Sequence, residues 1–441
     1  MKNVYMIGIG MGNSGGLSVE CRKIIETADF VAGASRVVES VRNLLDKKCE
    51  VLCSYDPSEI ASKMETLSFK TAKLPFHFCV VFSGDVGFYS GAKKLSALLH
   101  KSGWNVIFKS GESSFQYLSS KLCEPWQDWS LVSAHGTECD IASEIALNDA
   151  TFFLTGGKIT AKTIVDFVLE NQISSRLVVA DRLGYDDEII IDLCLDFCDE
   201  KKHSAFVMKN SDYEKLSEMK LACVLVDRRG FKSEEEKNRP PFMDSAFSRN
   251  FPKKTDSENA AESEKLVPMT KRMVRSAVLS LLSVRDGETV WDVGAGTGAV
   301  SIDIAKSAKC HVFSVDANES AVNLEKKNRK KFGAWNVDLH LGRAKDVLPD
   351  FPPPSAVFVG GSEGELSEII SIAFEKNPSA RVLVSSVTAE TFADCVVLSE
   401  KMNLSMEITE IAVSASQKIG KIHMRKSENA VSLILLNKNA E

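Results

Sequence analysis

Three glycines follow an apolar run that ends in an aspartate, and this pattern carries the strongest chemical signal in the sequence. Residues 290–300 read VWDVGAGTGAV, in which the residues of interest are Asp292, Gly294, Gly296 and Gly298. Glycines at this spacing allow a tight turn and leave backbone N–H groups open to a ligand. A second apolar run, residues 311–315, ends in Asp316, about where a βαβ unit places a ribose-binding carboxylate. The pattern predicts a site for a nucleotide-like cofactor.

Two cofactor chemistries are compatible with such a turn. Gly294, Gly296 and Ala299 satisfy the loose dinucleotide fingerprint G-x-G-x-x-A. A carboxylate at Asp292 would repel a pyrophosphate, whereas it favours the sulfonium and ammonium groups of S-adenosylmethionine, which has no phosphate. Asp292 and Asp316 together therefore favour an S-adenosylmethionine site of the methyltransferase type. A dinucleotide-dependent oxidoreductase and a tight turn without a cofactor are the alternatives.

The length and composition of the chain exclude several classes of protein. Its 441 residues predict two or three domains, and 44% hydrophobic with 26% charged residues is ordinary for a globular protein. A formal net charge of −6 argues against nucleic acid as a partner, because phosphate binding needs a basic surface. No apolar run reaches the ~20 residues that span a bilayer, so no membrane partner is expected. The 11 scattered cysteines predict reduced thiols in a cytoplasmic protein, and we expect no metal site.

Residues 1–227 alternate strand and helix patterns, and small polar residues follow one apolar run after another. The segments that show this are SGDVGFY from Ser83, KSGESS from Lys109, SAHG from Ser133 and LTGG from Leu154. Ligands bind outside the carboxyl ends of strands in open α/β sheets, so we expect these segments to line one cleft.

Several of these segments resemble the tetrapyrrole methylase family, the methyltransferases that build corrins and sirohaem. The segments are VYMIGIGMG, VAGASR, SGDVGFYS, GESSFQYL, SAHG and LTGG, and the resemblance covers roughly residues 3–227. It is closest to the members that methylate carbon 5 of precorrin-6B. It implies two α/β subdomains with S-adenosylmethionine folded between them. The residues it implicates in cofactor binding are Gly10, Gly84, Asp85, Gly87, Phe88, Ser113, Ser114, His135, Thr155 and Gly156.

Residues 228–265 break this alternating pattern. They mix both signs of charge with Pro, Ser and Asn and contain few aliphatic side chains. Such a composition cannot bury enough apolar surface to fold alone, so it predicts a linker between domains at 1–227 and 266–441. Phe242, Phe247 and Phe251 can still anchor part of this linker to a domain.

Residues 266–441 predict a second α/β domain. Strands are expected at residues 289–293, 311–315, 337–341, 356–360, 381–385, 406–413 and 432–436. Helix patterns separate the first five strands. The last two leave no room for a crossover helix, so an antiparallel pair is expected at one edge. This layout resembles the Rossmann-like, seven-stranded fold of the class I S-adenosylmethionine-dependent methyltransferases.

Three segments of this domain resemble the precorrin methyltransferases that methylate carbon 15 of precorrin-6B and remove a carboxyl group. They are PMTKRMVR from Pro268, VWDVGAGTGAVSI from Val290 and VFVGGS from Val357. The resemblance implies a second S-adenosylmethionine site. The residues expected to bind this cofactor are Thr270, Asp292, Gly294, Gly296, Gly298, Asp316, Ala344 and Gly360. Arg343 stands where the family has an acidic residue near the adenine.

Together the two resemblances imply a bifunctional methyltransferase of cobalamin biosynthesis that acts on one tetrapyrrole, with or without cobalt. A methyltransferase of another tetrapyrrole and a non-catalytic S-adenosylmethionine sensor are the alternatives. The substrate carries many carboxylates, so Arg and Lys should bind it. The candidates are Lys271 and Arg275, with Lys158, Lys162 and Arg182 in the N-terminal half. Methyl transfer mainly needs positioning and exclusion of water, so no catalytic residue is assigned. The resemblance also implies a homo-oligomer.

Overall fold

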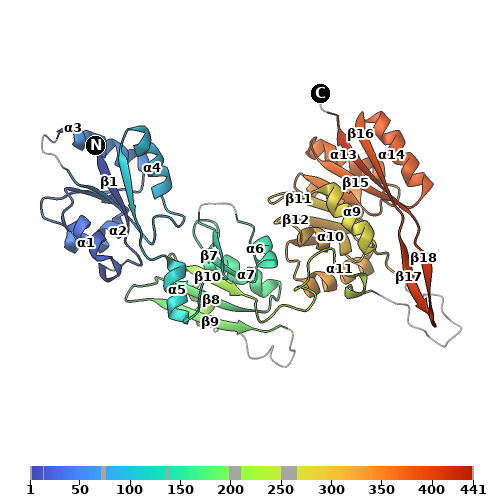
Figure 1. The fold of residues 1–441 in the computed structure, drawn as a ribbon, viewed down its shortest axis with the longest axis horizontal. Coiled ribbons are helices and arrows are strands. Elements are labelled where there is room, and N and C mark those ends of the chain that lie inside the picture. Colours follow the sequence, from blue (N-terminus) through green and yellow to red (C-terminus); the bar gives the residue numbers. More distant parts are fainter. Residues whose placement is uncertain are drawn as a thin grey trace. The chain divides into compact units, whose positions relative to one another are not determined.

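The computed structural model describes residues 2–12, 14–70, 76–135, 139–197, 210–249 and 266–439. The chain divides into two compact units (Figure 1). The first comprises Met1–Cys139 and Asp149–Arg229, and the second comprises Asp140–Asn148 and Gly230–Glu441. Within the described ranges, every helix is too short or too polar to cross a bilayer.

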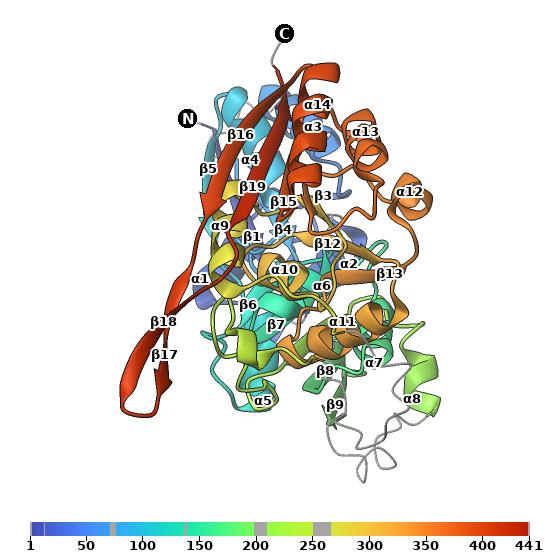
Figure 2. The same ribbon diagram turned by 90° about the vertical axis from the view of Figure 1, so that its right-hand side faces the viewer.

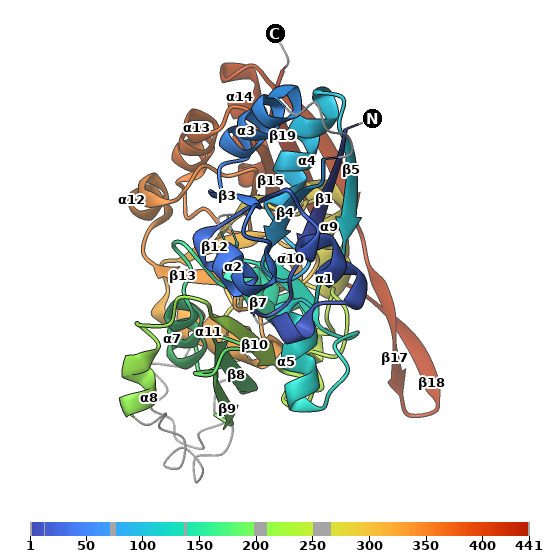
Figure 3. The ribbon, with the colours of Figure 1, turned by 90° about the vertical axis from the view of Figure 1, so that its left-hand side faces the viewer.

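The first unit starts with a parallel sheet in the order β3-β2-β4-β1-β5 (Figure 3). Its strands are β1 (Asn3–Gly8), β2 (Phe30–Gly33), β3 (Glu50–Cys53), β4 (Phe78–Phe82) and β5 (Asn105–Lys109). Its helices are α1 (Val19–Glu26), α2 (Ser35–Ser40), α3 (Pro57–Lys70) and α4 (Ala92–Lys101), with 3₁₀ turns η1 (Ser14–Gly16) and η2 (Arg42–Leu44). Side chains alternate across the sheet, so Met6 and Val80 pack with α3 and α4, whereas Ile7 and Val81 pack with α1 and α2. Because the strands are parallel, their carboxyl ends meet at one edge.

A second, mixed sheet completes the first unit, in the order β6-β7-β10-β8-β9. Its strands are β6 (Ser130–Ser133), β7 (Ala150–Leu154), β8 (Ser175–Asp181), β9 (Ile189–Leu195) and β10 (Cys223–Asp227). The helices of this part are α5 (Ser114–Leu122), α7 (Ala161–Glu170) and α8 (Asn210–Lys215); α6 (Ile141–Leu147) is grouped with the second unit. Met11 and Phe88, from loops after β1 and β4, pack against the core of this second sheet. The loops that carry the predicted site are therefore held between the two sheets.

The second unit contains one large sheet in the order β13-β12-β11-β14-β15-β19-β16. Its strands are β11 (Thr289–Val293), β12 (His311–Asp316), β13 (Val337–Leu341), β14 (Ala356–Val359), β15 (Arg381–Ser386), β16 (Leu404–Ile411) and β19 (Val431–Lys438). β19 runs antiparallel to both β15 and β16, and the other neighbours are parallel. The predicted α/β fold with a late antiparallel pair is confirmed.

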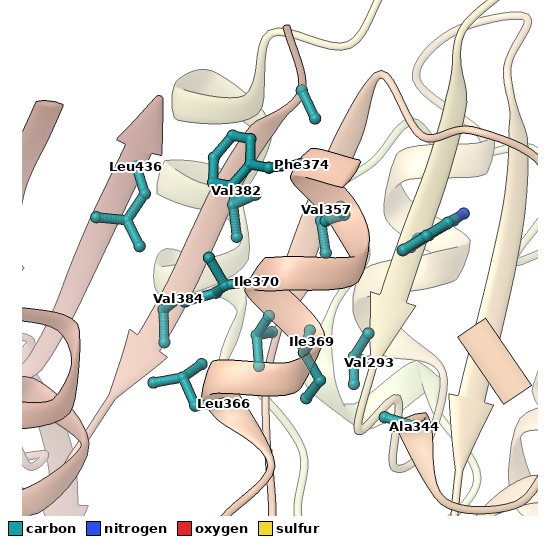
Figure 4. Close-up of a cluster of buried hydrophobic side chains, with 14 of the residues drawn as sticks. Val293, Ala344, Val357, Leu366, Ile369, Ile370, Phe374, Val382, Val384 and Leu436 are labelled. Atoms are coloured by element: carbon teal, nitrogen blue, oxygen red, sulfur yellow. The ribbon is translucent and has the colours of Figure 1, made fainter. Parts of the chain in front are cut away.

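Helices cover both faces of this sheet. They are α9 (Arg272–Leu282), α10 (Ala299–Ala305), α11 (Glu319–Phe332), α12 (Ala344–Val347), α13 (Leu366–Lys376) and α14 (Ala389–Lys401), with 3₁₀ turns η4 (Asp244–Ala246) and η5 (Leu348–Asp350). Figure 4 shows one face, where Ile369, Ile370 and Phe374 of α13 pack on Val357 and Val382 of the strands. Strands buried on both faces explain why the sequence shows continuous apolar runs rather than strict alternation.

A ribbon of two strands between β16 and β19 was not predicted. It consists of β17 (Ser414–Ile419) and β18 (Ile422–Ser427), which pair antiparallel with each other. Every residue of both strands is exposed, and the ribbon projects beyond the large sheet (Figure 2).

Residues 230–249, which the composition assigns to a linker, pack against the second unit. Phe242 and Phe247 are buried, and the ring of each lies 4.6 Å from that of Phe332 in α11. The segment contains few aliphatic side chains, and its two buried aromatic rings supply most of the apolar contact. Residues 250–265 lie outside the described residues, so the predicted linker has no structural account there.

Candidate functional site

A cavity of about 260 Å³ lies at the carboxyl ends of the parallel strands of the second unit. Its wall is built from the segments that directly follow β11, β12, β13 and β14, together with the residues before α9. The predicted cofactor-binding residues that line it are Thr270, Gly294, Gly296, Asp316, Ala344 and Gly360. Residues from separate motifs are thus brought to one place.

Gly294 and Gly296 leave no room for a side chain, because the backbone of other segments lies against the turn. Gly294 has φ of +72°, and a Cβ there would lie 2.6 Å from the carbonyl oxygen of Gly361. Gly296 has φ of +60°, and its Cβ would lie 2.8 Å from the carbonyl oxygen of Pro268. A side chain at either position would move the wall of the cavity.

Asp316 fixes the turn and faces the cavity. Its Oδ2 accepts a hydrogen bond from the N–H of Gly296 at 2.8 Å, and its Oδ1 accepts one from the N–H of Asn318 at 2.8 Å. A carboxylate oxygen has two acceptor positions, so both oxygens can also accept from the hydroxyls of a ribose. The carboxylate therefore suits the role that its spacing predicts.

Asp292 and Gly298 do not line this cavity, which corrects the expectation that they contact the cofactor. Gly298, with φ of +75°, is the N-cap of α10, and its Cβ would lie 2.4 Å from Cγ of Glu325. Asp292 is fully buried behind the turn. Strand alternation directs its side chain to the same face of the sheet as Val290, opposite to Trp291 and Val293.

Asp292 belongs instead to a buried acidic cluster with Ser301 and Glu325. The Oγ of Ser301 hydrogen-bonds Oδ2 of Asp292 and lies 2.8 Å from Oε1 of Glu325. A hydroxyl donates one hydrogen, so one of the two carboxyl groups must be protonated for both contacts to be hydrogen bonds. Burial raises the pKa of Asp292 to about 7; burial and the charge of Asp292 raise the pKa of Glu325 to about 8.

These raised pKa values predict that alkali destabilises the protein. The ordinary values are 3.8 for Asp292 and 4.5 for Glu325, so the folded chain holds protons that the unfolded chain releases. The free energy of unfolding should therefore fall as the pH rises from 4.5 to about 8. Glu325→Gln removes one titrating group and should make this fall smaller by up to about 5 kcal/mol, because the pKa of Glu325 rises from 4.5 to about 8 and one pKa unit corresponds to about 1.4 kcal/mol.

Urea unfolding of the full chain at about pH 5 and about pH 9 measures this difference. Glu319→Gln is the matched control, because Glu319 is exposed at the start of the same helix. The control should follow the parent protein at both pH values. Equal losses of stability in the parent protein and in Glu325→Gln would contradict a protonated cluster.

The two basic residues of this unit that the sequence suggests for substrate binding do not line the cavity. Lys271 is the N-cap of α9 and is not part of the wall. Arg275 is fully buried, with Nε 2.5 Å from Oδ2 of Asp303 and a second nitrogen 2.7 Å from Oδ1 of Asp244. It also donates to the carbonyl oxygen of Thr270 at 2.6 Å. Arg275 is thus a positioning residue for Thr270, and its assignment to substrate is corrected.

Sequence reasoning missed a carboxylate on the cavity wall. Arg343 lines the cavity, and its Nε lies 2.6 Å from Oε1 of Glu365, which is only 6% exposed and also lines it. Glu365 is the N-cap of α13, so this carboxylate reaches the cavity from a different segment than Arg343. The sequence gives no direct signal for this, because Glu365 lies 22 residues further along the chain.

The first unit has a cavity of about 250 Å³ between its two sheets. The predicted residues on its wall are Gly84, Asp85, Phe88, Ser113, Ser114, His135 and Thr155. Gly10, Gly87 and Gly156 lie behind the wall rather than on it. These three act through the residues that they support.

Each of these supporting contacts can be traced. The N–H of Gly84 donates to the carbonyl oxygen of Gly10 at 2.9 Å, and the carboxylate of Asp85 accepts from the N–H of Gly87 at 2.7 Å. Gly156 leaves room for His135, since a Cβ would lie 1.7 Å from its Nδ1. That Nδ1 is 3.3 Å from the carbonyl oxygen of Thr155.

Arg36, Tyr185 and the segment 220–222 also line this cavity and were not predicted. Arg36 ends the quoted VAGASR segment and follows β2 closely, which is the signal that could have identified it. Of the substrate candidates in this unit, Arg182 lines the cavity, whereas Lys162 is not part of the wall and forms an ion pair with Asp166.

These two units define an α/β methyltransferase. Residues 3–196 match the family described as tetrapyrrole (corrin/porphyrin) methylases, and residues 263–438 match the precorrin methyltransferase domain. The chain belongs to the precorrin methyltransferases and carries a tetrapyrrole methylase domain ahead of the precorrin methyltransferase domain. Members of these families use S-adenosylmethionine.

One relative and two solved structures illustrate these matches, and each of them covers one part of the chain. The probable cobalt-precorrin-6B C(15)-methyltransferase (decarboxylating) of Pyrobaculum calidifontis is 38% identical over 171 residues, 38% of this chain and 88% of the relative. The precorrin-6y C5,15-methyltransferase structure from Geobacter metallireducens is 32% identical, covers 39% of this chain and 90% of its own, and has a TM-score of 0.37. The precorrin-6Y methylase structure from Archaeoglobus fulgidus is 16% identical, with 51% and 97% covered and a TM-score of 0.36.

Proposed function

We propose that the chain is a bifunctional methyltransferase of cobalamin biosynthesis. It methylates carbons 5 and 15 of precorrin-6B, or of its cobalt form, and decarboxylates the ring C acetate. The observation that carries this proposal is the presence of both matched domains in one chain, each with a cavity at the ends of its motif-bearing strands. The activity for which the Pyrobaculum relative is named supports the assignment of the second domain.

Each cavity is proposed to bind one S-adenosylmethionine. In the second unit, Gly294 and Gly296 offer backbone to the cofactor, and Asp316 accepts from its ribose. In the first unit, Gly84, Asp85 and Phe88 provide the corresponding wall. The fit rests on the glycine turn, where a Cβ would displace the wall, and on the free acceptor positions of Asp316.

The chemistry follows from how the chain holds its ligands. S-adenosylmethionine supplies a methyl group on a cationic sulfur, which keeps the electron pair of the broken C–S bond. The attacking ring carbon of the substrate forms the new C–C bond with its enamine-like π electrons, and the ring system then releases a proton to become neutral again. In decarboxylation, the electrons of the bond to the carboxyl group pass into the macrocycle, carbon dioxide leaves, and a proton is taken up. The protein's part is to align the reacting carbon and to exclude water.

The proposed domains are a tetrapyrrole methylase domain at 1–227 and a class I domain at 266–441. Residues 230–249, within the proposed linker at 228–265, act as an extension of the second unit. A homo-oligomer is also proposed on the family resemblance, and sedimentation of the full chain tests it.

Calorimetric titration of S-adenosylhomocysteine into the full chain tests the proposed function. We expect two binding sites per chain, and NAD should displace the ligand from neither. Incubation with S-adenosylmethionine and precorrin-6B should give a product that gains two methyl groups and loses one carbon dioxide. Binding without turnover would favour a sensor, and displacement by NAD would favour an oxidoreductase.

A further inference from the structure

A second cavity of the first unit adjoins the proposed cofactor cavity. It has a volume of about 320 Å³ and lies where β2, β3 and β4 end, with Gly33, Ser54 and Phe82 on its wall. The residues that line both cavities are Arg36, Ser83, Tyr89, Ser90 and His135. A ligand in the second cavity would therefore lie next to a cofactor in the first, as methyl transfer requires.

Arg36 is exposed and brings a positive charge to both cavities, and among the described residues its guanidinium has no ion pair with a carboxylate. Its guanidinium donates to the hydroxyl of Tyr185 and, at 3.4 Å, to Oγ of Ser83. Both partners are neutral. Other arginines of this unit do hold carboxylates, namely Arg22, Arg176, Arg182 and Arg229.

The remaining charges of these walls leave the positive charge of Arg36 uncompensated. The carboxylate on the wall is that of Asp85, whose two oxygens accept from the N–H groups of Gly87 at 2.7 Å and Gly111 at 3.0 Å. Lys220 adds a further cation to the wall of the cofactor cavity. An arginine in this setting suits a carboxylate, which its planar fork can bind through two parallel hydrogen bonds.

Two tyrosines give the second cavity an exposed aromatic surface. Tyr55 is 89% exposed and Tyr89 is 55% exposed, although their rings are large and partly apolar. Tyr89 is also held at φ of +45°, a backbone conformation that costs a non-glycine residue about 1 kcal/mol. A flat macrocycle would bury both rings, since aromatic faces stack on other π systems.

We infer that this second cavity receives the edge of the tetrapyrrole substrate and that Arg36 binds one of its carboxylates. The inference rests on the proposed function and assigns its substrate subsite in the first unit. The methionine carboxylate of the cofactor is the other possible source of a negative charge. The substrate is favoured because Arg36 also lines the second cavity, whose wall includes Tyr55 but neither Gly84 nor Asp85 of the proposed cofactor turn.

The test compares the full chain with Arg36→Gln, which keeps hydrogen-bond donors but removes the charge. Uroporphyrin III, a macrocycle with carboxylate side chains, is titrated and followed by its absorbance; its methyl ester is the uncharged control. We expect a ten- to hundred-fold loss of uroporphyrin affinity in the variant, since a hydrogen bond to a charged group is lost. The Michaelis constant for precorrin-6B in carbon-5 methylation should rise by a similar factor, and Arg36→Lys should restore part of it.

Arg22→Gln is the matched control, because Arg22 is an exposed arginine of the same unit that pairs with Glu26. The affinity for S-adenosylhomocysteine should be the same in all variants. A loss of that affinity in Arg36→Gln would overturn the inference and assign Arg36 to the cofactor. Equal uroporphyrin binding by the parent protein and Arg36→Gln, or no binding by either, would also overturn it. Uroporphyrin binding that depends on Arg36 without carbon-5 methylation would uphold the subsite and reject the proposed function.

Discussion

Gly294→Ala should abolish cofactor binding in the second unit and leave one binding site per chain for S-adenosylhomocysteine. The new Cβ would lie 2.6 Å from the oxygen and 2.7 Å from the nitrogen of Gly361, and both are backbone atoms that cannot rotate away. The left-handed φ of +72° adds about 1 kcal/mol of strain. Because both segments line the cavity, any relief of the clash moves its wall.

We expect at least a hundred-fold loss of affinity at this site, which corresponds to about 2.8 kcal/mol. Calorimetry measures it directly, because the stoichiometry should fall from two to one. Gly230→Ala is the control, since no atom lies within 4 Å of its added Cβ. Two sites of unchanged affinity in Gly294→Ala would show that the cofactor does not use this turn.

Arg275→Met should reduce stability more than any other substitution considered for this chain. The buried guanidinium holds Asp303 at 2.5 Å, Asp244 at 2.7 Å and the carbonyl oxygen of Phe242 at 2.5 Å. Burial raises the pKa of Asp303 to about 6 although the charge of Arg275 lowers it, so Asp303 without Arg275 would be strongly disfavoured as an anion. Removing one partner of a buried ion pair costs about 3–5 kcal/mol.

Urea unfolding of the full chain measures this loss. The double variant Arg275→Met, Asp303→Leu should recover part of the stability, because neither charge is then left alone in the interior. Lys271→Met, four residues earlier in the chain, should change stability by less than about 0.5 kcal/mol. If Arg275 bound substrate instead, Arg275→Met would raise the Michaelis constant and leave the unfolding curve in place.

The sequence predicts the sheet of the second unit and the glycine turn well, because both depend on local spacing. Apolar runs at regular intervals give the strands, and the alternation of Gly294 and Gly296 with small residues gives the turn. The face of the strand on which Asp292 lies could have been predicted from strand alternation. Trp291 and Val293 belong to one apolar cluster and Val290 to the other, so Asp292 lies on the same face as Val290. Motif spacing gives the position of a residue along a strand. Whether that position is odd or even relative to its neighbours decides on which face of the sheet the side chain lies.

The long-range contacts of the site could not be predicted in the same way. Arg275, Val278 and Leu282 share the buried stripe of α9, which is a signal that Arg275 is interior. Its partners Asp244 and Phe242 lie about thirty residues upstream, in a stretch whose composition indicates a linker. For Arg36, the sequence does not reveal that the neighbouring side chains are neutral, because its neighbours come from loops that follow different strands.

The packing of residues 230–249 affects where this chain can be divided. The family match of the second domain begins at residue 263, but Phe242 and Asp244 supply hydrogen bonds to the buried Arg275–Asp303 pair from upstream of that point. A protein that starts at residue 263 would bury the Arg275 guanidinium and the Asp303 carboxylate without the hydrogen bonds that Phe242 and Asp244 provide. The segment between the two enzymes has thus become part of the second one, so exchanging the C-terminal enzyme for a relative would require a junction ahead of residue 241 rather than at the family boundary.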